Sequence, residues 1–453
     1  MTQKKTGFVN FLQEFSIPLI SGVVVALFYA NLDWESYHHI VELNPFAALL
    51  GEGWGFLFGH EVTIHFLVND IFMVFFFGIA AKEITESVLP GGSLNPLGKA
   101  LNPIFSTLGG VVGPVGVFFL ALWGCMELDM FPGAEPATLQ KGWGIPTATD
   151  IALAWLVSRT VFGAGHPAVS FLLLLAVADD AIGLVIIAIF YGDPSHPAEP
   201  TWLLLVLSAM VLAGVLRKLQ VQKWQPYIFV AGPIAWAGLV LARLHPALAL
   251  VFIVPFLPGP KRDTGLFVEA DEADLAGHGK HSPLHNFEHE LKLFVDLGLF
   301  FFAFANAGVQ FAGIGPMTWV ILGALVFGKT IGITVFGLAA HKFGLPLPDR
   351  MGLKELMMAA FIAALGLTVA LFVAAAAFVD PDLLGQAKMG ALFSGFVGIV
   401  AIVIGKLIGL GAGSGVQTSA SSGKQPPGAT TDGLPSAGML EDRDAVAGPP
   451  TSR

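Results

Sequence analysis

Residues 172–191, LLLLAVADDAIGLVIIAIFY, form an apolar run that is long enough to cross a bilayer as one helix. Only Asp179 and Asp180 interrupt it. A charged side chain near the bilayer centre costs about 2.5–3.5 kcal/mol, so such residues face the protein interior or water and mark functional sites. The run therefore predicts a membrane-spanning helix that carries a functional pair of carboxylates.

The composition of the chain is that of an integral membrane protein. Of its 453 residues, 55% are hydrophobic and 12% are charged, whereas a soluble domain carries about 25% charged residues. Cys125 is the single cysteine, which excludes an intrachain disulfide and a cysteine-based metal site. No small-residue cleavage site follows the first apolar run, so we expect that run to be kept as a membrane helix.

Apolar segments of membrane-spanning length recur along most of the chain. They predict an all-α polytopic membrane protein with about 12 transmembrane helices over residues 1–411. Residues 37–61 are too polar to span and are expected to form an interfacial loop, and the Gly/Ser/Pro-rich residues 412–453 are expected to form a disordered tail. The segments lie at residues 14–31, 62–82, 103–126, 143–162, 167–191, 201–219, 225–242, 244–258, 291–311, 317–341, 353–379 and 385–411.

Lysine and arginine are concentrated in every second loop. Positive charge accumulates in cytoplasmic loops, so this alternation predicts that both termini, including the tail, are cytoplasmic. The basic residues on that side include Lys4, Lys5, Lys82, Lys99, Arg159, Arg217, Lys218, Lys342 and Arg350.

Two segments carry helix-breaking or small residues at mid-span. Residues 143–155, WGIPTATDIALAW, contain Gly144 and Pro146, and residues 358–378, MAAFIAALGLTVALFVAAAAF, contain Gly366. Each is the second segment of a three-helix group, and such a pair in corresponding positions of two halves indicates an inverted-topology repeat with a binding site at the breaks. Glycine and proline are also ordinary in membrane helices, so continuous helices are the alternative.

Four charged residues lie inside predicted spans, namely Asp150, Asp179, Asp180 and Lys329. Unpaired, they would together cost on the order of 10 kcal/mol, so they must face one another or water. An ion-pair network that only holds helices together is one alternative, but it leaves two carboxylates over. Adjacent carboxylates titrate as a coupled unit, and oxygen atoms are the ligands that hard cations prefer. Asp180 and Asp179, with oxygens near Thr149, are therefore the predicted site for a cation or protons.

Asp150 and Lys329 are assigned a different role. Broken helices expose partial positive charge at their N-terminal ends and partial negative charge at their C-terminal ends. We expect Asp150 beside positive ends and Lys329 beside negative ends, so that each offsets the charge of the helix termini.

Five motifs occur in order along the chain: VNDIFMVFFFGIAAKE (68–83), GIPTATDIALA (144–154), AVADDAIGLVIIAIFY (176–191), FFAFANAGV (301–309) and GKTIGI (328–333). They resemble motifs of the NhaA family of bacterial sodium/proton antiporters, and the resemblance covers roughly residues 15–410. It implies inverted repeats with two crossing broken helices.

The resemblance implies a role for each matching residue. Asp180 is implied to be the principal cation ligand, and Asp179 to be the second carboxylate, neutralised by Lys329 when no cation is bound. Glu83 matches a glutamate that is implicated in pH sensing at the cytoplasmic funnel. The residues implied to lie at the crossing of the broken helices are Thr149, Asp150, Gly366 and Thr368.

The chain departs from the family pattern around the second break and in the pH-sensing segments. Ala364 and Ala370 replace a glycine and a serine in ALGLTVA (364–370). The charged run after Glu83 is thinned to ITES, and the segment FEHELKL offers Glu288 as a further pH-sensing candidate. Asp296 is an added carboxylate whose role the pattern does not give.

A histidine-rich stretch precedes the ninth span. A zinc site is possible there in principle, but a solvated amphipathic stretch that enters the helix is the prediction that we favour. Its histidines are His278, His281, His285 and His289.

The predicted function is secondary transport rather than enzymatic catalysis: exchange of cytoplasmic Na⁺ (or Li⁺) for external protons by alternating access. Two carboxylates that both release protons to admit one Na⁺ would make the exchange electrogenic, with two protons per cation, and would serve pH and sodium homeostasis at the bacterial inner membrane. We expect membrane lipids as surroundings, no cofactor and no nucleic-acid partner; the choice of cation, the pH of activation and a homodimeric state are left open.

Two other classes of protein would also carry aspartates or sodium sites in the membrane. An intramembrane aspartyl protease expects Gly-x-Gly-Asp and Tyr-Asp elements, whereas this chain has AVADD and TATD. A Na⁺-driven symporter needs an additional pocket for an organic solute, and the sequence shows no polar complement for one.

Overall fold

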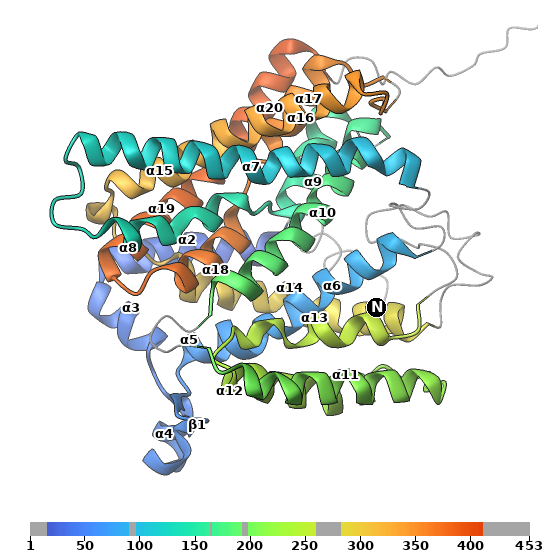
Figure 1. Ribbon diagram of the computed structural model, residues 1–453. Coiled ribbons are helices and arrows are strands. Elements are labelled where there is room, and N and C mark those ends of the chain that lie inside the picture. The colour runs from blue at the N-terminus through green and yellow to red at the C-terminus, as the bar shows by residue number, and fades with distance from the viewer. Residues whose placement is uncertain are drawn as a thin grey trace, which may run out of the picture. The chain divides into compact units, whose positions relative to one another are not determined.

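The computed structural model describes residues 16–89, 97–163, 165–192, 198–259, 282–348 and 350–410. The predicted tail over 412–453 and two of the loop histidines, His278 and His281, lie outside the described residues. The described part is a bundle of helices with one short β-hairpin, and the long helix α7 (Leu97–Glu127) runs across the bundle (Figure 1). The predicted all-α membrane fold is confirmed.

The helices follow the predicted spans in order, and several spans are built from two consecutive elements. The α-helices are α2 (Ile17–Leu32), α3 (Trp34–Val41), α4 (Pro45–Leu50), α5 (Ile64–Phe66), α6 (Met73–Val88), α7, α8 (Pro136–Gln140), α9 (Ile151–Phe162), α10 (Pro167–Phe190), α11 (Leu203–Lys218), α12 (Gly232–Leu241), α13 (Ala249–Ile253), α14 (Pro283–Ala307), α15 (Pro316–Gly323), α16 (Thr330–Lys342), α17 (Leu353–Ile362), α18 (Leu367–Ala377), α19 (Pro381–Ser394) and α20 (Phe396–Ile408). Short 3-10 or π-helical pieces are η1 (Glu52–Trp54), η2 (Leu67–Phe72), η3 (Lys141–Thr147), η4 (Pro200–Trp202), η5 (Tyr227–Ala231), η6 (Pro246–Leu248), η7 (Val254–Phe256), η9 (Phe311–Gly313) and η10 (Ala324–Lys329).

By length and hydropathy, six helices of the described part are able to cross a membrane alone, and the bent pair α17–α18 makes a seventh span. Four further apolar helices are shorter, and they include the closely spaced pair over Tyr227–Leu241 and Pro246–Phe256.

The segment between the first two spans is more ordered than the predicted interfacial loop. Asp33 caps α3 by accepting the N–H of Ser36, and Asn44 caps α4 by accepting the N–H of Ala47. A hairpin of β1 (Phe56–Leu57) and β2 (His60–Glu61) follows. Local capping therefore gives structure to a stretch whose polarity had suggested only a loop.

Both predicted helix breaks are present. At the first break, the 3-10 piece η3 ends at Thr147 and α9 begins only at Ile151. At the second break, the α17–α18 pair bends by 49°. A Cβ atom added to Gly366 would lie 3.1 Å from the carbonyl oxygen of Ala148, so glycine lets the two unwound backbones approach. The breaks meet directly, because the N–H of Asp150 donates to the carbonyl of Leu365 at 2.6 Å.

Glycines bring another pair of spans into backbone contact. A Cβ on Gly109 of α7 would collide with the carbonyl of Gly332 in α16, and one on Gly113 would collide with the carbonyl of Gly328 in η10. This close approach holds Lys329, the residue after Gly328, against the interior of the bundle.

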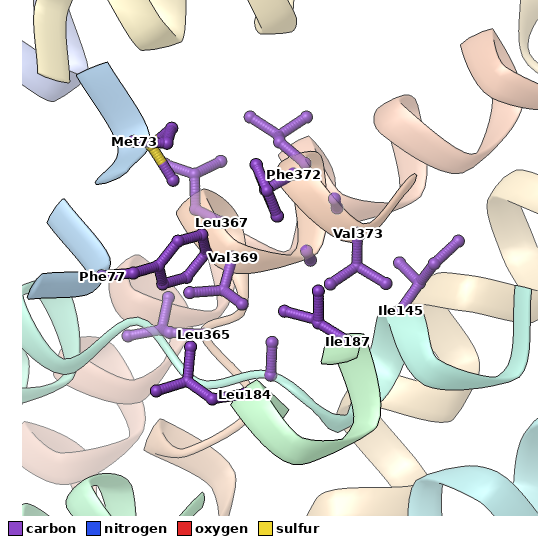
Figure 2. Packing of buried hydrophobic residues seen from close by; sticks show 14 of the residues in the cluster. Met73, Phe77, Ile145, Leu184, Ile187, Leu365, Leu367, Val369, Phe372 and Val373 are labelled. Atoms are coloured by element: carbon purple, nitrogen blue, oxygen red, sulfur yellow. The ribbon is translucent and has the colours of Figure 1, made fainter. Parts of the chain in front are cut away.

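The apolar core surrounds the second broken helix. Buried side chains of α18, among them Phe372 and Val373, lie beside Met73 and Phe77 of α6 and Ile145 of η3 (Figure 2). The polar groups at the breaks are therefore enclosed by apolar walls.

Candidate functional site

Asp150 connects the two broken helices. Its Oδ1 accepts the N–H of Leu153 at 3.1 Å and so caps α9. Its Oδ2 accepts the N–H of Thr368 at 3.3 Å and the hydroxyl of Thr368 at 2.9 Å, in the first turn of α18. A carboxylate at two helix N-termini is stabilised by both partial positive charges, which is the position predicted for Asp150.

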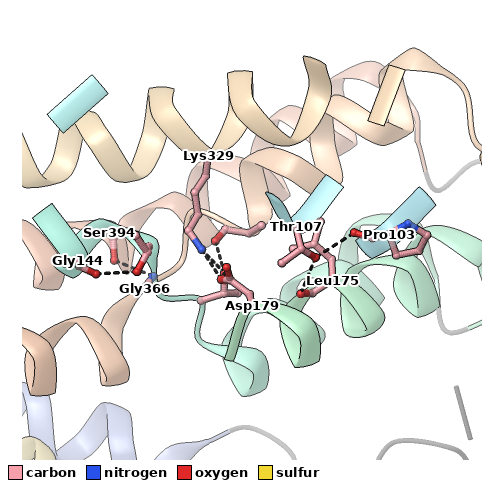
Figure 3. A network of polar contacts seen from close by, with 11 residues as sticks. Pro103, Thr107, Gly144, Leu175, Asp179, Lys329, Gly366 and Ser394 are labelled. Atoms are coloured by element: carbon pink, nitrogen blue, oxygen red, sulfur yellow. Dashed lines mark hydrogen bonds and ion pairs between the residues drawn. The ribbon is translucent and has the colours of Figure 1, made fainter. Parts of the chain in front are cut away.

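Lys329 reaches into the same region from the opposite span. Its Nζ lies 2.6 Å from Oδ2 of Asp179 and 2.5 Å from Oγ1 of Thr149 (Figure 3). Lys329 and Asp179 are both fully buried at the side chain. A buried ion pair persists only when its geometry is good and further hydrogen bonds support it, and here the Thr149 hydroxyl supplies that support at 2.7 Å from Asp179.

Thr149 also joins this ion pair to the second break. Its hydroxyl lies 3.0 Å from the carbonyl oxygen of Ala363, a group that the unwound chain after α17 frees from helical bonding. The two breaks, the Asp–Lys pair and the double-aspartate helix therefore share one connected set of hydrogen bonds.

Part of the carboxylate pair is left without a protein partner. Oδ1 of Asp179 is buried and accepts no hydrogen bond from any residue that the structure describes. Among the described residues, Asp180 has neither a hydrogen bond nor an ion pair, and its side chain is only partly buried. Unsatisfied oxygen atoms in an apolar interior are costly unless a ligand, a proton or water completes them.

Both aspartates border a small pocket. Asp179, Asp180, Ala148 and Gly183 line it, and its volume of about 10 Å³ is close to what one water molecule requires. Its remaining walls are apolar side chains, of which Figure 2 labels Phe77, Leu184, Ile187 and Val369; the other two are Phe76 and Ala80. The pocket fits a proton-bearing water or one small cation held by carboxylate oxygens.

A larger cavity of about 240 Å³ lies farther along the same helices. It is bordered by Phe372 of α18 and Asp70 of η2, and by His245, whose Nδ1 lies 3.9 Å from Oδ1 of Asp70. The ring of Phe372 packs edge-on against Phe77 at 4.9 Å between ring centres. Because Phe77 borders the small pocket and Phe372 the large cavity, this aromatic pair stands between them.

A second charged cluster gathers around a buried lysine. Lys82 of α6 forms ion pairs with Glu83 at 3.3 Å, with Glu86 one helical turn on, and with Glu288 of α14. Both predicted pH-sensing candidates, Glu83 and Glu288, are thus in one cluster. Although the sequence after Glu83 is less charged than the family pattern, Glu86 adds a carboxylate there, and the i,i+4 spacing of Lys82 and Glu86 was the signal that the sequence analysis missed.

The remaining predicted residues lie apart from the crossing. Asp296 sits in the middle of α14, partly buried. The rings of His285 and His289 are 6.3 Å apart at the start of α14. Burial lowers the pKa of the His285 imidazole, and the nearby Glu288 opposes this effect.

The comparisons agree with the motifs. The family model described as Na⁺/H⁺ antiporter 1 matches residues 8–408. The Na⁺/H⁺ antiporter NhaA of Geobacter sulfurreducens is 57% identical over 400 residues, which cover 88% of this chain and 97% of that protein. The Na⁺/H⁺ antiporter NhaA of Desulfitobacterium hafniense is 56% identical over 410 residues, 90% of this chain and 97% of that protein, and that of Jannaschia sp. is 44% identical over 425 residues, 88% and 97%.

Proposed function

Because this chain belongs to the Na⁺/H⁺ antiporter 1 family of multi-pass bacterial membrane transporters, we propose that Asp179 and Asp180 are its exchange site. Cytoplasmic Na⁺ or Li⁺ and external protons compete for the oxygens of this pair. The observation that carries the proposal is that Asp179 and Asp180 line one small pocket, while Oδ1 of Asp179 and the carboxylate of Asp180 have no hydrogen-bond partner among the described residues.

Lys329 holds the site closed to cations until protons leave. Its ammonium group neutralises the Asp179 carboxylate across 2.6 Å. A Na⁺ ion that binds both carboxylates takes the place of Lys329 at Asp179. A buried ammonium left without its partner costs several kcal/mol, so loading one Na⁺ removes two protons: one from Asp180 and one shared by the Asp179–Lys329 pair.

This stoichiometry couples exchange to the membrane voltage. Two protons against one Na⁺ move one net charge in each cycle, and a potential of about 100 mV supplies about 2.3 kcal/mol for that charge. At 1.36 kcal/mol per decade this corresponds to roughly a fiftyfold ion gradient. An exchanger of this kind serves sodium and pH homeostasis at the inner membrane.

Alternating access requires the pocket to open toward one aqueous phase at a time. The distribution of Lys and Arg favours a cytoplasmic location of both termini. With that orientation, the large cavity around Asp70 and His245 faces the outside, and the packed rings of Phe77 and Phe372 close the route from it to Asp180.

The test is Na⁺-induced collapse of a pH gradient in everted vesicles, with and without a permeant ion that clamps the voltage. Electrogenic exchange predicts a collapse that slows when the voltage is allowed to build up. An equal rate of collapse with and without the permeant ion would refute the stoichiometry of two protons per Na⁺. A collapse that needs an added organic solute would indicate a symporter instead.

A further inference from the structure

In each three-helix group, a hydroxyl from the third span binds the backbone of the broken second span. In the first group the hydroxyl belongs to Tyr191, directly after α10. In the second group it belongs to Ser394, the last residue of α19. We call these two hydroxyls the clamps.

The Tyr191 clamp holds the 3-10 piece that leads into the first break. Its hydroxyl accepts the N–H of Gly144 at 2.8 Å and donates to the carbonyl of Lys141 at 2.7 Å. A Cβ on Gly144 would collide with the phenol ring, so glycine is what allows the ring to approach. One side chain therefore satisfies a donor and an acceptor of η3.

The Ser394 clamp holds the second break itself. Its hydroxyl donates to the carbonyl of Ala391 at 2.6 Å and accepts the N–H of Gly366 at 3.2 Å, and the side chain is fully buried (Figure 3). Gly366 caps α18, and the break frees its N–H from helical bonding. Within the described residues, this break is also bonded to Thr149 and Asp150, which both belong to the first broken helix.

The clamps act on groups that hold the exchange site. Thr149 follows η3 by two residues and contacts both Asp179 and the carbonyl of Ala363. Asp150 bonds to Leu365, the residue before Gly366. A shift of either unwound segment therefore moves Thr149 or the freed carbonyls relative to the carboxylates.

We propose that Tyr191 and Ser394 are positioning residues for ion exchange: each fixes one broken helix to the third span of its own group and so sets the geometry of the crossing. Neither touches the ion pocket. This inference rests on the proposed exchange site at Asp179 and Asp180.

The experiment measures the Na⁺ concentration dependence of exchange in proteoliposomes for Tyr191→Phe and Ser394→Ala, each of which removes a single oxygen atom. The apparent KM for Na⁺ is expected to rise about five- to tenfold while the maximal rate per folded protein stays within about twofold. A structural loss alone would lower the amount of active protein and leave KM unchanged.

Two matched variants serve as controls. Tyr227→Phe removes another buried phenol oxygen, which binds Val221 away from the crossing. Ser158→Ala removes a fully buried serine hydroxyl whose one hydrogen bond among the described residues is to the carbonyl of Trp155, three residues back in its own helix. Both are expected to keep the wild-type KM.

The outcomes separate the clamps from the site. Unchanged KM in both clamp variants, or an equal rise in the controls, overturns the inference. If Ser394→Ala does not fold, Ser394→Cys takes its place, because cysteine has a similar volume and is a weaker hydrogen-bond acceptor. A wild-type KM in Ser394→Cys would overturn the role proposed for Ser394. Exchange that persists in Asp180→Asn, measured in parallel, overturns the proposed site and not the clamps.

Discussion

The carboxylate of Asp150 accepts both the backbone N–H and the hydroxyl of Thr368, at 3.3 Å and 2.9 Å, across the crossing of two broken helices. One negative charge is thereby shared by the N-termini of α9 and α18. Its printed carboxylate contacts lie within the crossing, whereas an oxygen of Asp179 and the carboxylate of Asp180 accept no hydrogen bond from the described residues. The three aspartates therefore differ in their hydrogen bonding, and their substitution is expected to have different effects.

Substitution of Asp180 by Asn is expected to abolish Na⁺-dependent proton movement, because the neutral amide neither exchanges a proton nor offers an anionic ligand. Asp179→Asn is expected to leave exchange impaired by at least about tenfold. Asp382→Asn, at an exposed acidic residue of α19, is the control that should behave as wild type. Collapse of the pH gradient in everted vesicles is the readout, and wild-type rates in Asp180→Asn would contradict the assignment.

Removal of Lys329 should make the protein depend on Na⁺ for stability. Lys329→Gln leaves the Asp179 carboxylate buried without its ion-pair partner, which typically costs 3–5 kcal/mol. We expect a lower melting temperature in Na⁺-free detergent solution and a larger rise on adding Na⁺ than in wild type. The double variant Asp179→Asn/Lys329→Gln should recover most of the loss; if it melts as low as the single variant, the pairing is not the cause.

The Lys82 cluster is expected to modulate the pH dependence of exchange. Glu288→Gln removes one of three carboxylates around Lys82, and with it an anionic neighbour that favours proton binding by the cluster. The activity–pH profile should then shift toward acid by about one pH unit. Glu290→Gln, at an exposed glutamate two residues away, is the control, and superimposable curves for Glu288→Gln and wild type would remove the cluster from pH control.

The N-terminal cap that His166 forms on α10, the helix that carries Asp179 and Asp180, is expected to weaken in acid. Its Nδ1 accepts the N–H of Ala168 as the cap of α10, and its ring stacks on Phe162 at 5.3 Å. Burial lowers the pKa of His166, while the nearby Glu355 opposes and Arg350 reinforces that effect. The cap therefore contributes its full stability above the ordinary histidine pKa of about 6.5, and that stability is lost as the pH falls from there through the lowered pKa of His166 in the folded protein.

The measurement for this cap is hydrogen exchange in the first turn of α10, compared between wild type and His166→Asn at the same pH. Asparagine is a good capping acceptor that does not titrate. At pH 5.5 the wild-type turn should exchange faster than the variant, by up to about fivefold for a cap worth about 1 kcal/mol. Equal rates at pH 5.5 would show that the cap does not sense acid.

The sequence predicted the spans and the residues at the crossing because each carries a strong local signal. A charge within a long apolar run, as at Asp179 or Lys329, is conspicuous, and so is a glycine or proline at mid-span. Contacts between distant segments carry no such signal: Lys82 with Glu288, and Ser394 with Gly366, depend on which helix faces share an interface. The hairpin near Phe56 was missed because its strands are only two residues long.

The backbone contact of α7 with η10 and α16 limits which parts of the molecule can move. No side chain separates Gly109 from Gly332 or Gly113 from Gly328. At these contacts the spans therefore lack rotatable side chains whose rearrangement would let one helix slide past the other. They make a poor hinge. The rearrangements that the proposed alternating access requires are therefore expected where flexible side chains fill the interface, as between α6 and α10 around Phe77.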